Sequence, residues 1–173
     1  ATMGYSLPAG IGVALAKESG QVFAITGDGS LQQNIQEFKT LVGLEIPVKL
    51  FVLNNDGYLS IRASQNNYYE GRLIGSGPTS GVTIPDTLKV AAAYGLKAIR
   101  IHTNAELSEG LDFALAFDGP IVVDILCPPD QAIIPSVASK IGEDGKMHSR
   151  PLEDMAPFLD RDEYLANMYI PTV

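Results

Sequence analysis

The chain has 173 residues, enough for one domain with a hydrophobic core, and its 46% hydrophobic and 18% charged residues are typical of a globular domain. The net charge of -8, without any basic run, excludes a surface built for nucleic acid or an anionic membrane, since both require clustered Lys and Arg. No apolar run approaches the roughly 20 residues of a membrane-spanning helix, and the single cysteine, Cys127, excludes an internal disulfide, so we expect a cytoplasmic protein.

Short runs rich in β-branched and aromatic residues predict the strands. They are VFAIT at 22–26, VKLFVL at 48–53, the weaker KAIRI at 97–101 and PIVVDIL at 120–126. Nearly continuous apolar runs of this kind indicate strands that are buried on both faces, as in parallel sheets.

Helical patterns alternate with these strands. They cover residues 7–19, 34–45, 85–95 and 104–117. Strands that alternate with helices of this length form βαβ units, so the sequence predicts an α/β fold with a doubly wound, mostly parallel sheet and helices on both faces.

Two segments depart from this alternation. Residues 66–81 form a glycine-rich connection without a clear period, and such long connections are often lids or binding loops. Residues 128–173 are punctuated by prolines, and we expect an irregular tail. The expected organisation is therefore one domain over residues 1–173 with that tail at its end.

The stretch Gly27-Asp28-Gly29-Ser30 follows the first strand and precedes a helix, which places it at the carboxyl edge of the sheet, where open α/β folds bind ligands. The two glycines allow a sharp turn and a close approach to a ligand. The amino end of a helix suits a phosphate, but an aspartate beside a phosphate needs a cation between them. Asp28 therefore indicates Mg²⁺. Taken alone, the motif has an alternative interpretation as a tight turn with a helix cap.

A second turn, Asn54-Asn55-Asp56-Gly57, ends the next strand, and it too has the composition of an ordinary turn. Strands joined by one crossover helix can lie side by side, so both turns would face the same crevice. Asp28 and Asn55 would then flank one Mg²⁺, with a backbone carbonyl near Gly57 as a third ligand. Diphosphate oxygens and a water would complete the octahedron.

Two other kinds of phosphate site are excluded by their motifs. A nicotinamide dinucleotide loop requires the third glycine of G-x-G-x-x-G, which Gly27-Asp28-Gly29 lacks, and has no place for an acidic residue. A P-loop requires Gly-Lys-Ser or Gly-Lys-Thr, which does not occur in the sequence.

The two turns together match a known motif. GDG, followed after 24 residues (30–53) by Asn54-Asn55, is the thiamine-diphosphate motif. With MGYSLPAGIGVALA, IPVKLFVLNNDGY and AAAYGLKAIRI, the chain resembles the C-terminal diphosphate-binding domain of acetolactate-synthase-like enzymes over about residues 1–129. The resemblance implies a thiamine-diphosphate-dependent lyase or transferase that decarboxylates 2-oxo acids and forms carbon–carbon bonds.

The resemblance also implies a set of site residues. Asp28, the Asn55 side chain and the backbone oxygen of Gly57 would ligate Mg²⁺. Met3 would wedge the cofactor into its bent form, although a core methionine is the alternative, and the Ala1 carbonyl would accept the pyrimidine amino group. The cofactor-binding residues are then Ala1, Met3, Gly27, Gly29, Ser30, Asn55, Gly57 and Tyr58.

The chain lacks two domains of the family. Nothing in it corresponds to the N-terminal pyrimidine-binding domain, which carries the activating glutamate, or to the middle domain, which binds FAD in acetolactate synthases. We therefore expect no catalytic residue and no bound FAD in this chain, which would be inactive alone. The pyrimidine-binding domain of a partner chain would complete the site, in a homodimer or homotetramer. The alternative is a cofactor-binding subunit of a two-subunit 2-oxo acid decarboxylase.

The acceptor pocket also departs from the family. Ser60 and Ser64 stand where acetolactate synthases carry a methionine and a tryptophan, and the sequence has no tryptophan. We expect a more polar pocket for a different acceptor, such as a larger or sugar-like carbonyl. A 2-oxo acid decarboxylase is equally compatible with these residues.

Overall fold

The computed structural model of the chain describes residues 2–17, 20–137, 139–141 and 144–170. Two compact units follow each other along the chain, residues 1–131 and residues 132–173, and each is described by itself. In the part of the chain that the structure describes, no helix is long and apolar enough to cross a bilayer.

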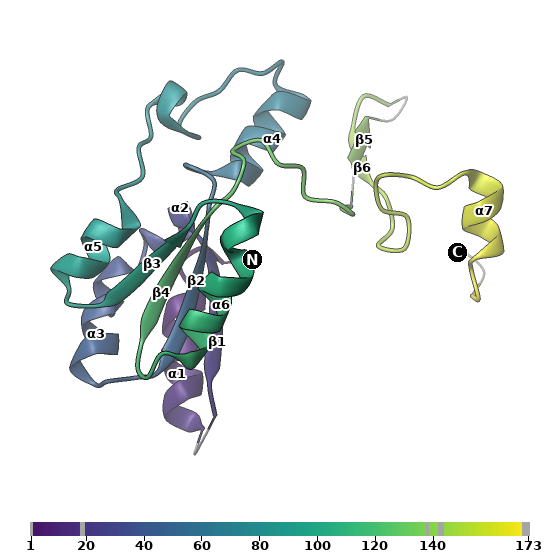
Figure 1. Cartoon of the computed structure of the whole chain (residues 1–173). Helices are drawn as coiled ribbons and strands as arrows, with labels where there is room; N and C mark the ends of the chain where they lie inside the picture. Colours follow the sequence, from purple (N-terminus) through teal and green to yellow (C-terminus); the bar gives the residue numbers. More distant parts are fainter. Residues whose placement is uncertain (1, 18–19, 138, 142–143, 171–173) are drawn as a thin grey trace. The chain divides into compact units, whose positions relative to one another are not determined.

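The first unit is built on a four-stranded parallel sheet. Its strands are β1 (Val22–Gly27), β2 (Val48–Asn54), β3 (Lys97–Ile101) and β4 (Ile121–Leu126). Their order across the sheet is β1-β2-β4-β3, and every pair is parallel (Figure 1). The four predicted strands are therefore confirmed to within one residue at each end.

Helices cover both faces of this sheet. Helices α1 (Ser6–Ala16), α3 (Phe38–Gly43) and α5 (Thr87–Ala93) pack with alternate β2 residues in one hydrophobic core. Helix α6 (Leu107–Ala116) packs on the opposite face, in a separate core. The predicted doubly wound α/β fold is confirmed.

The two edge strands differ from the prediction that each strand is buried on both faces. Strand β3 has one buried residue, Ile101, and the residues of strand β1 alternate between buried and exposed. Phe23 and Ile25 are 55% and 62% exposed because α6 lies over the other strands of that face. An apolar run does not reveal which strand stands at an edge, since the covering element lies elsewhere in the sequence.

The connections carry short elements that the sequence pattern does not predict in full. The pattern at 34–45 is split into a 3-10 turn, η1 (Ile35–Glu37), and α3, and one turn of helix, α2 (Asp28–Leu31), precedes them. Helix α4 (Leu59–Tyr68) was not predicted, because it has no buried residue and so no apolar stripe. The glycine-rich connection contains one 3-10 turn, η2 (Pro78–Ser80), and another, η3 (Asn104–Glu106), precedes α6.

The second unit forms most of the segment 128–173 that was expected as an irregular tail, and its described residues contain three short elements. Strands β5 (Ser139–Ile141) and β6 (Met147–Ser149) pair antiparallel, and helix α7 (Arg161–Ala166) follows. Arg150 and Arg161 both donate to the buried carboxylate of Asp154. These elements are too short to produce a detectable period, which is why the sequence pattern does not reveal them.

One polar network ties α5 to the sheet. Asp86 caps α5 by accepting the Lys89 N–H at 3.0 Å, and its other oxygen lies 3.3 Å from Nη1 of Arg100 on β3. Nε of Arg100 donates at 2.7 Å to Asp124, a fully buried carboxylate in β4. The N–H of Lys89 and the Arg100 guanidinium hold the pKa of Asp86 below its usual range.

We predict that Asp86→Ala lowers the free energy of unfolding by about 1 kcal/mol, the usual loss for a helix N-cap. Asp86→Asn keeps the cap and should lose less. Because the pKa of Asp86 is lowered in the folded state, its contribution is present above the ordinary carboxyl range and is lost as the pH falls through the lowered value. Urea unfolding of the three proteins at neutral and acidic pH measures both effects, and an Asn variant as unstable as the Ala variant would contradict the capping role.

Candidate functional site

The two motif turns meet at the carboxyl edge of the sheet. Strand β1 pairs with β2 so that Gly27 lies beside Leu53, and the chain leaves both strands at that edge. The prediction that these strands are neighbours is confirmed. Helix α2, which follows the first turn, has only four residues, so the helix dipole expected there is small and backbone N–H groups remain the main positive element.

Asp28 is a buried carboxylate with one oxygen unpaired. The residue is 0% exposed, and its Oδ2 accepts the N–H of Gly57 at 2.9 Å. Its Oδ1 is buried and has no hydrogen-bond donor among the described residues. Burial raises the pKa of Asp28, while the N–H groups of Gly57, Gly29, Asn55 and Asp56 act in the opposite direction. A buried anionic oxygen without a donor is a group that a cation would satisfy.

The second turn is held by Asn54, which the sequence analysis did not single out. Its Oδ1 accepts the N–H of Asp56 at 3.2 Å, and its Nδ2 donates to Asp124 Oδ1 at 3.0 Å. Asp56 has a φ of +58°, which an aspartate tolerates better than most residues. The sequence did contain one sign of this network: Asp124 is an acidic residue inside the apolar run PIVVDIL, and a buried charge needs polar partners. Arg100 and Asn54 are those partners.

The two turns touch through glycines. A Cβ on Gly29 would lie 2.5 Å from Cε1 of Tyr58 and 3.2 Å from the carbonyl oxygen of Gly57, so only glycine fits there. Gly57 has a φ of +134°, a conformation that side chains rarely adopt. The structure therefore brings Asp28, Gly29, Gly57 and Tyr58 together as one group.

Asn55 lies in the same turn. Its backbone N–H favours the charged form of the Asp28 carboxylate and so acts to lower the pKa of Asp28. Its backbone oxygen and side-chain Oδ1 lie 2.7 and 3.4 Å from Nη2 of Arg62. In the part of the chain that the structure describes, no three His, Cys, Asp or Glu side chains gather. A cation at Asp28 would therefore depend on amide, carbonyl and ligand oxygens, as Mg²⁺ sites often do.

Ser30 and Met3 line a cavity beside this group. The Ser30 Oγ accepts the N–H of Gly4 at 2.8 Å, which fixes the turn that carries Met3. The cavity has a volume of about 770 Å³, and Met3, Gly27, Ser30 and Ser60 are among the residues that line it. Ser64 is exposed on the same helix as Ser60, and Ala1 lies outside the described residues.

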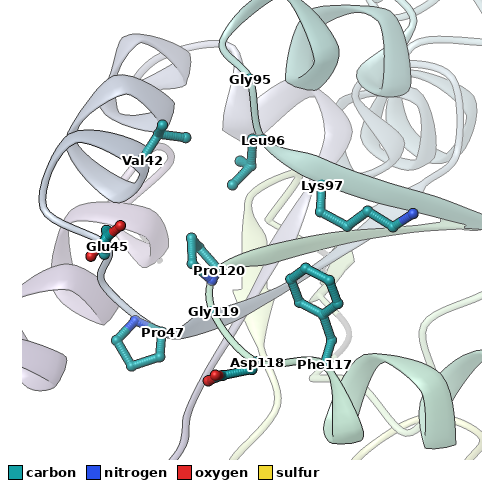
Figure 2. A pocket seen from close by; sticks show the side chains of 10 residues that line it. All are labelled: Val42, Glu45, Pro47, Gly95, Leu96, Lys97, Phe117, Asp118, Gly119 and Pro120. Atoms are coloured by element: carbon teal, nitrogen blue, oxygen red, sulfur yellow. The ribbon is translucent and has the colours of Figure 1, made fainter.

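A second cavity, of about 540 Å³, lies at the opposite edge of the sheet, where the strands begin (Figure 2). Its lining includes Lys97, Asp118 and Glu45, and none of the predicted site residues. The nearby Lys49 is 2% exposed, and its Nζ donates to the carbonyls of Phe117 and Gly119. This lysine is therefore occupied in holding the turn before β4.

Comparisons with known proteins agree with this arrangement. Residues 1–125 match the family model "Thiamine pyrophosphate enzyme, C-terminal TPP binding domain". The chain is 32% identical to the acetolactate synthase large subunit of Cyanidium caldarium over 151 residues, 87% of this chain and 25% of that protein. It is 32% identical over 141 residues to the chloroplastic acetolactate synthase of Arabidopsis thaliana, with 79% of this chain and 21% of that protein covered.

A solved structure shows the same fold. The thiamine diphosphate-dependent 4-hydroxybenzoylformate decarboxylase of Rhodococcus jostii superposes with a TM-score of 0.65 at 27% identity, covering 75% of this chain and 24% of that one. The chain thus spans about a quarter of the length of these proteins. On the family match over residues 1–125, the chain belongs to the thiamine pyrophosphate enzyme family and carries its C-terminal TPP-binding domain.

Proposed function

We propose that this chain holds the diphosphate of thiamine diphosphate through Mg²⁺ at the junction of its two turns. The observation that carries the proposal is the Oδ1 of Asp28, a buried anionic oxygen without a donor among the described residues. Asp28, the Asn55 side chain and the backbone oxygen of Gly57 are the proposed protein ligands. Their oxygens are of the kind that Mg²⁺ prefers.

The remaining residues would position the cofactor. Backbone groups of Gly27, Gly29, Ser30 and the Gly57-Tyr58 segment would hold the diphosphate, because the glycines leave the backbone accessible. Met3, 39% exposed in the cavity beside Ser30, would support the bend of the cofactor, and Ala1 would accept a hydrogen bond from its pyrimidine. When bound, thiamine diphosphate supplies the carbanion chemistry, and the chain supplies position and electrostatics.

For the whole protein we propose decarboxylation of a 2-oxo acid followed by carbon–carbon bond formation, as in an acetolactate-synthase-like enzyme. The similarity to acetolactate synthases supports this activity. The activating glutamate and any FAD would belong to parts that correspond to no segment of this chain. The pyrimidine-binding domain of a partner chain would complete the site in a homodimer or homotetramer, or a separate subunit would supply it. A cytoplasmic location stays a prediction.

A simple 2-oxo acid decarboxylase is the second candidate. Ser60 and Met3 both line the cavity, so a hydroxyl stands where acetolactate synthases carry a methionine. The similarity to a 4-hydroxybenzoylformate decarboxylase also favours it. Both candidates share the same cofactor site and differ only in whether a second carbonyl is accepted.

We predict that thiamine diphosphate binds this chain only when Mg²⁺ is present, because the cation must neutralise the repulsion between Asp28 and the diphosphate. Calorimetric titration of thiamine diphosphate with and without Mg²⁺ measures this, and Asp28→Ala should abolish the metal-dependent heat. Equal binding by both proteins without metal would contradict the proposed role of Asp28.

We predict that Asp28→Asn raises the free energy of unfolding of the metal-free protein by about 1 kcal/mol, because a neutral amide of nearly the same volume replaces a carboxyl group whose charged form is disfavoured by burial. With Mg²⁺ and thiamine diphosphate, only the wild type should gain stability. Asp56→Asn is the matched control, since Asp56 lies exposed in the adjoining turn. This variant should change neither the free energy of unfolding of the metal-free protein nor the gain in stability with ligands. Urea unfolding with and without ligands measures these quantities. A metal-free Asp28→Asn protein less stable than the wild type would count against the argument.

We predict that the whole protein releases CO₂ from a 2-oxo acid but makes little acetolactate from pyruvate, because Ser60 gives the pocket a more polar wall. Product analysis with pyruvate, alone and with added aldehydes, measures the acceptor preference. Acetolactate formed at ordinary enzyme rates would contradict the altered acceptor pocket while leaving the cofactor site in place.

A further inference from the structure

Arg62 on α4 joins three segments around the proposed cation site. All three of its guanidinium nitrogens donate hydrogen bonds. Every backbone acceptor is a neutral carbonyl oxygen, and the distances run from 2.6 to 3.1 Å; the acceptors are Asn55, Asp56, Ser76 and Pro129. The guanidinium thus binds the turn after β2, the glycine-rich connection and the segment after β4.

The geometry requires an arginine rather than any cation. In the part of the chain that the structure describes, no carboxylate lies within ion-pair distance of Arg62. Its role therefore rests on donor directions. A planar fork can serve carbonyls from three segments at once, whereas the donors of a lysine all leave from one atom.

Two glycines make room for the guanidinium. A Cβ on Gly77 would lie 2.7 Å from Nη1 of Arg62. A Cβ on Gly57 would lie 2.8 Å from the same atom and 2.5 Å from the Ser76 carbonyl oxygen. Gly77 has a φ of 179°, extended backbone that any residue adopts, so an alanine there would act only by making the end of the Arg62 side chain shift. The slot is therefore shaped around Arg62.

The same contacts reach the proposed ligands. Nη2 of Arg62 donates to the Asn55 carbonyl at 2.7 Å, and Nη1 donates to the Asp56 carbonyl at 3.1 Å. The Ser76 carbonyl, which accepts from Nη1 at 2.9 Å, also accepts the N–H of Tyr58 at 2.9 Å. Arg62 thus holds the turn that carries Asn55 and Gly57 through its carbonyls, while Asp28 accepts the N–H of Gly57.

We propose that Arg62 is a positioning residue that fixes the turn 54–57 for binding of the cation and the diphosphate, and that Gly77 leaves the space that its guanidinium occupies. This inference rests on the proposed function, because it assigns Arg62 to the same site. Arg62 does not contact the cofactor; it acts through the backbone carbonyls that it holds and through the Asn55 Oδ1, 3.4 Å from its Nη2.

The test measures the affinity of the full chain for thiamine diphosphate with Mg²⁺ by calorimetry. We expect Arg62→Ala to weaken binding about 10- to 100-fold, the usual effect of losing a group that orients metal ligands. Guanidinium at low millimolar concentration, well below denaturing levels, should restore binding, and ammonium should not. Arg62→Lys should remain weak. Arg72→Ala, which removes an equal charge from an exposed site in the same connection, is the control and should bind as the wild type does.

A second pair of variants tests the slot. Gly77→Ala should weaken binding as Arg62→Ala does, and adding Gly77→Ala to Arg62→Ala should cause no further loss, because the clash partner is gone. Hydrogen exchange at the amides of Asp56, Gly57 and Tyr58 in the cofactor-free chain provides a readout that needs no ligand. Exchange should accelerate in Arg62→Ala and slow again with guanidinium.

The outcomes separate this inference from the proposed function. Wild-type affinity in Arg62→Ala, or additive losses in the double variant, would overturn the role of Arg62 and leave the cofactor site intact. A wild-type chain that fails to bind the cofactor, but in which Arg62→Ala accelerates exchange reversibly, would overturn the proposed function and retain Arg62 as the residue that fixes the turn.

Discussion

The parallel pairing of β1 with β2 is the constraint on which the site depends. Because Gly27 lies beside Leu53, the residues that follow each strand meet at one edge, and the Asp28 carboxylate is buried against the N–H of Gly57. Burial leaves the other carboxylate oxygen without a donor among the described residues, which disfavours the charged form in the absence of a cation. The fold thus holds a carboxylate whose charged form would be stabilised by a bound cation.

Two separate sets of contacts keep the second turn in place. Asn54 is oriented by Asp124, which is in turn paired with Arg100, so a buried ionic network extends from the sheet into the turn. Arg62 holds the same turn through the backbone carbonyls of Asn55 and Asp56. Preorganisation of this kind lowers the entropic loss on binding, because few groups need to be ordered when the ligand arrives.

Local sequence patterns predicted the strands and the position of the two turns. Apolar runs marked the strands, and the spacing of Asp28 and Asn55 marked the motif, because both depend on neighbours in the chain. Asn54 and Asp124 could not be paired from sequence, since they lie 70 residues apart. Arg62 was not identified for a similar reason: its acceptors are backbone carbonyls, which leave no trace in residue type. Helix α4 was missed because an exposed helix has no apolar period.

The central claim is that Asp28 supplies an oxygen to a cation that also binds the diphosphate. The most direct measurement replaces Mg²⁺ by Mn²⁺ and records the electron paramagnetic resonance of the ion with thiamine diphosphate present, including couplings to ³¹P. We expect bound Mn²⁺ with strong phosphorus couplings in the wild type and loss of the bound signal in Asp28→Asn. Mn²⁺ bound without phosphorus couplings, or an unchanged signal in Asp28→Asn, would contradict it.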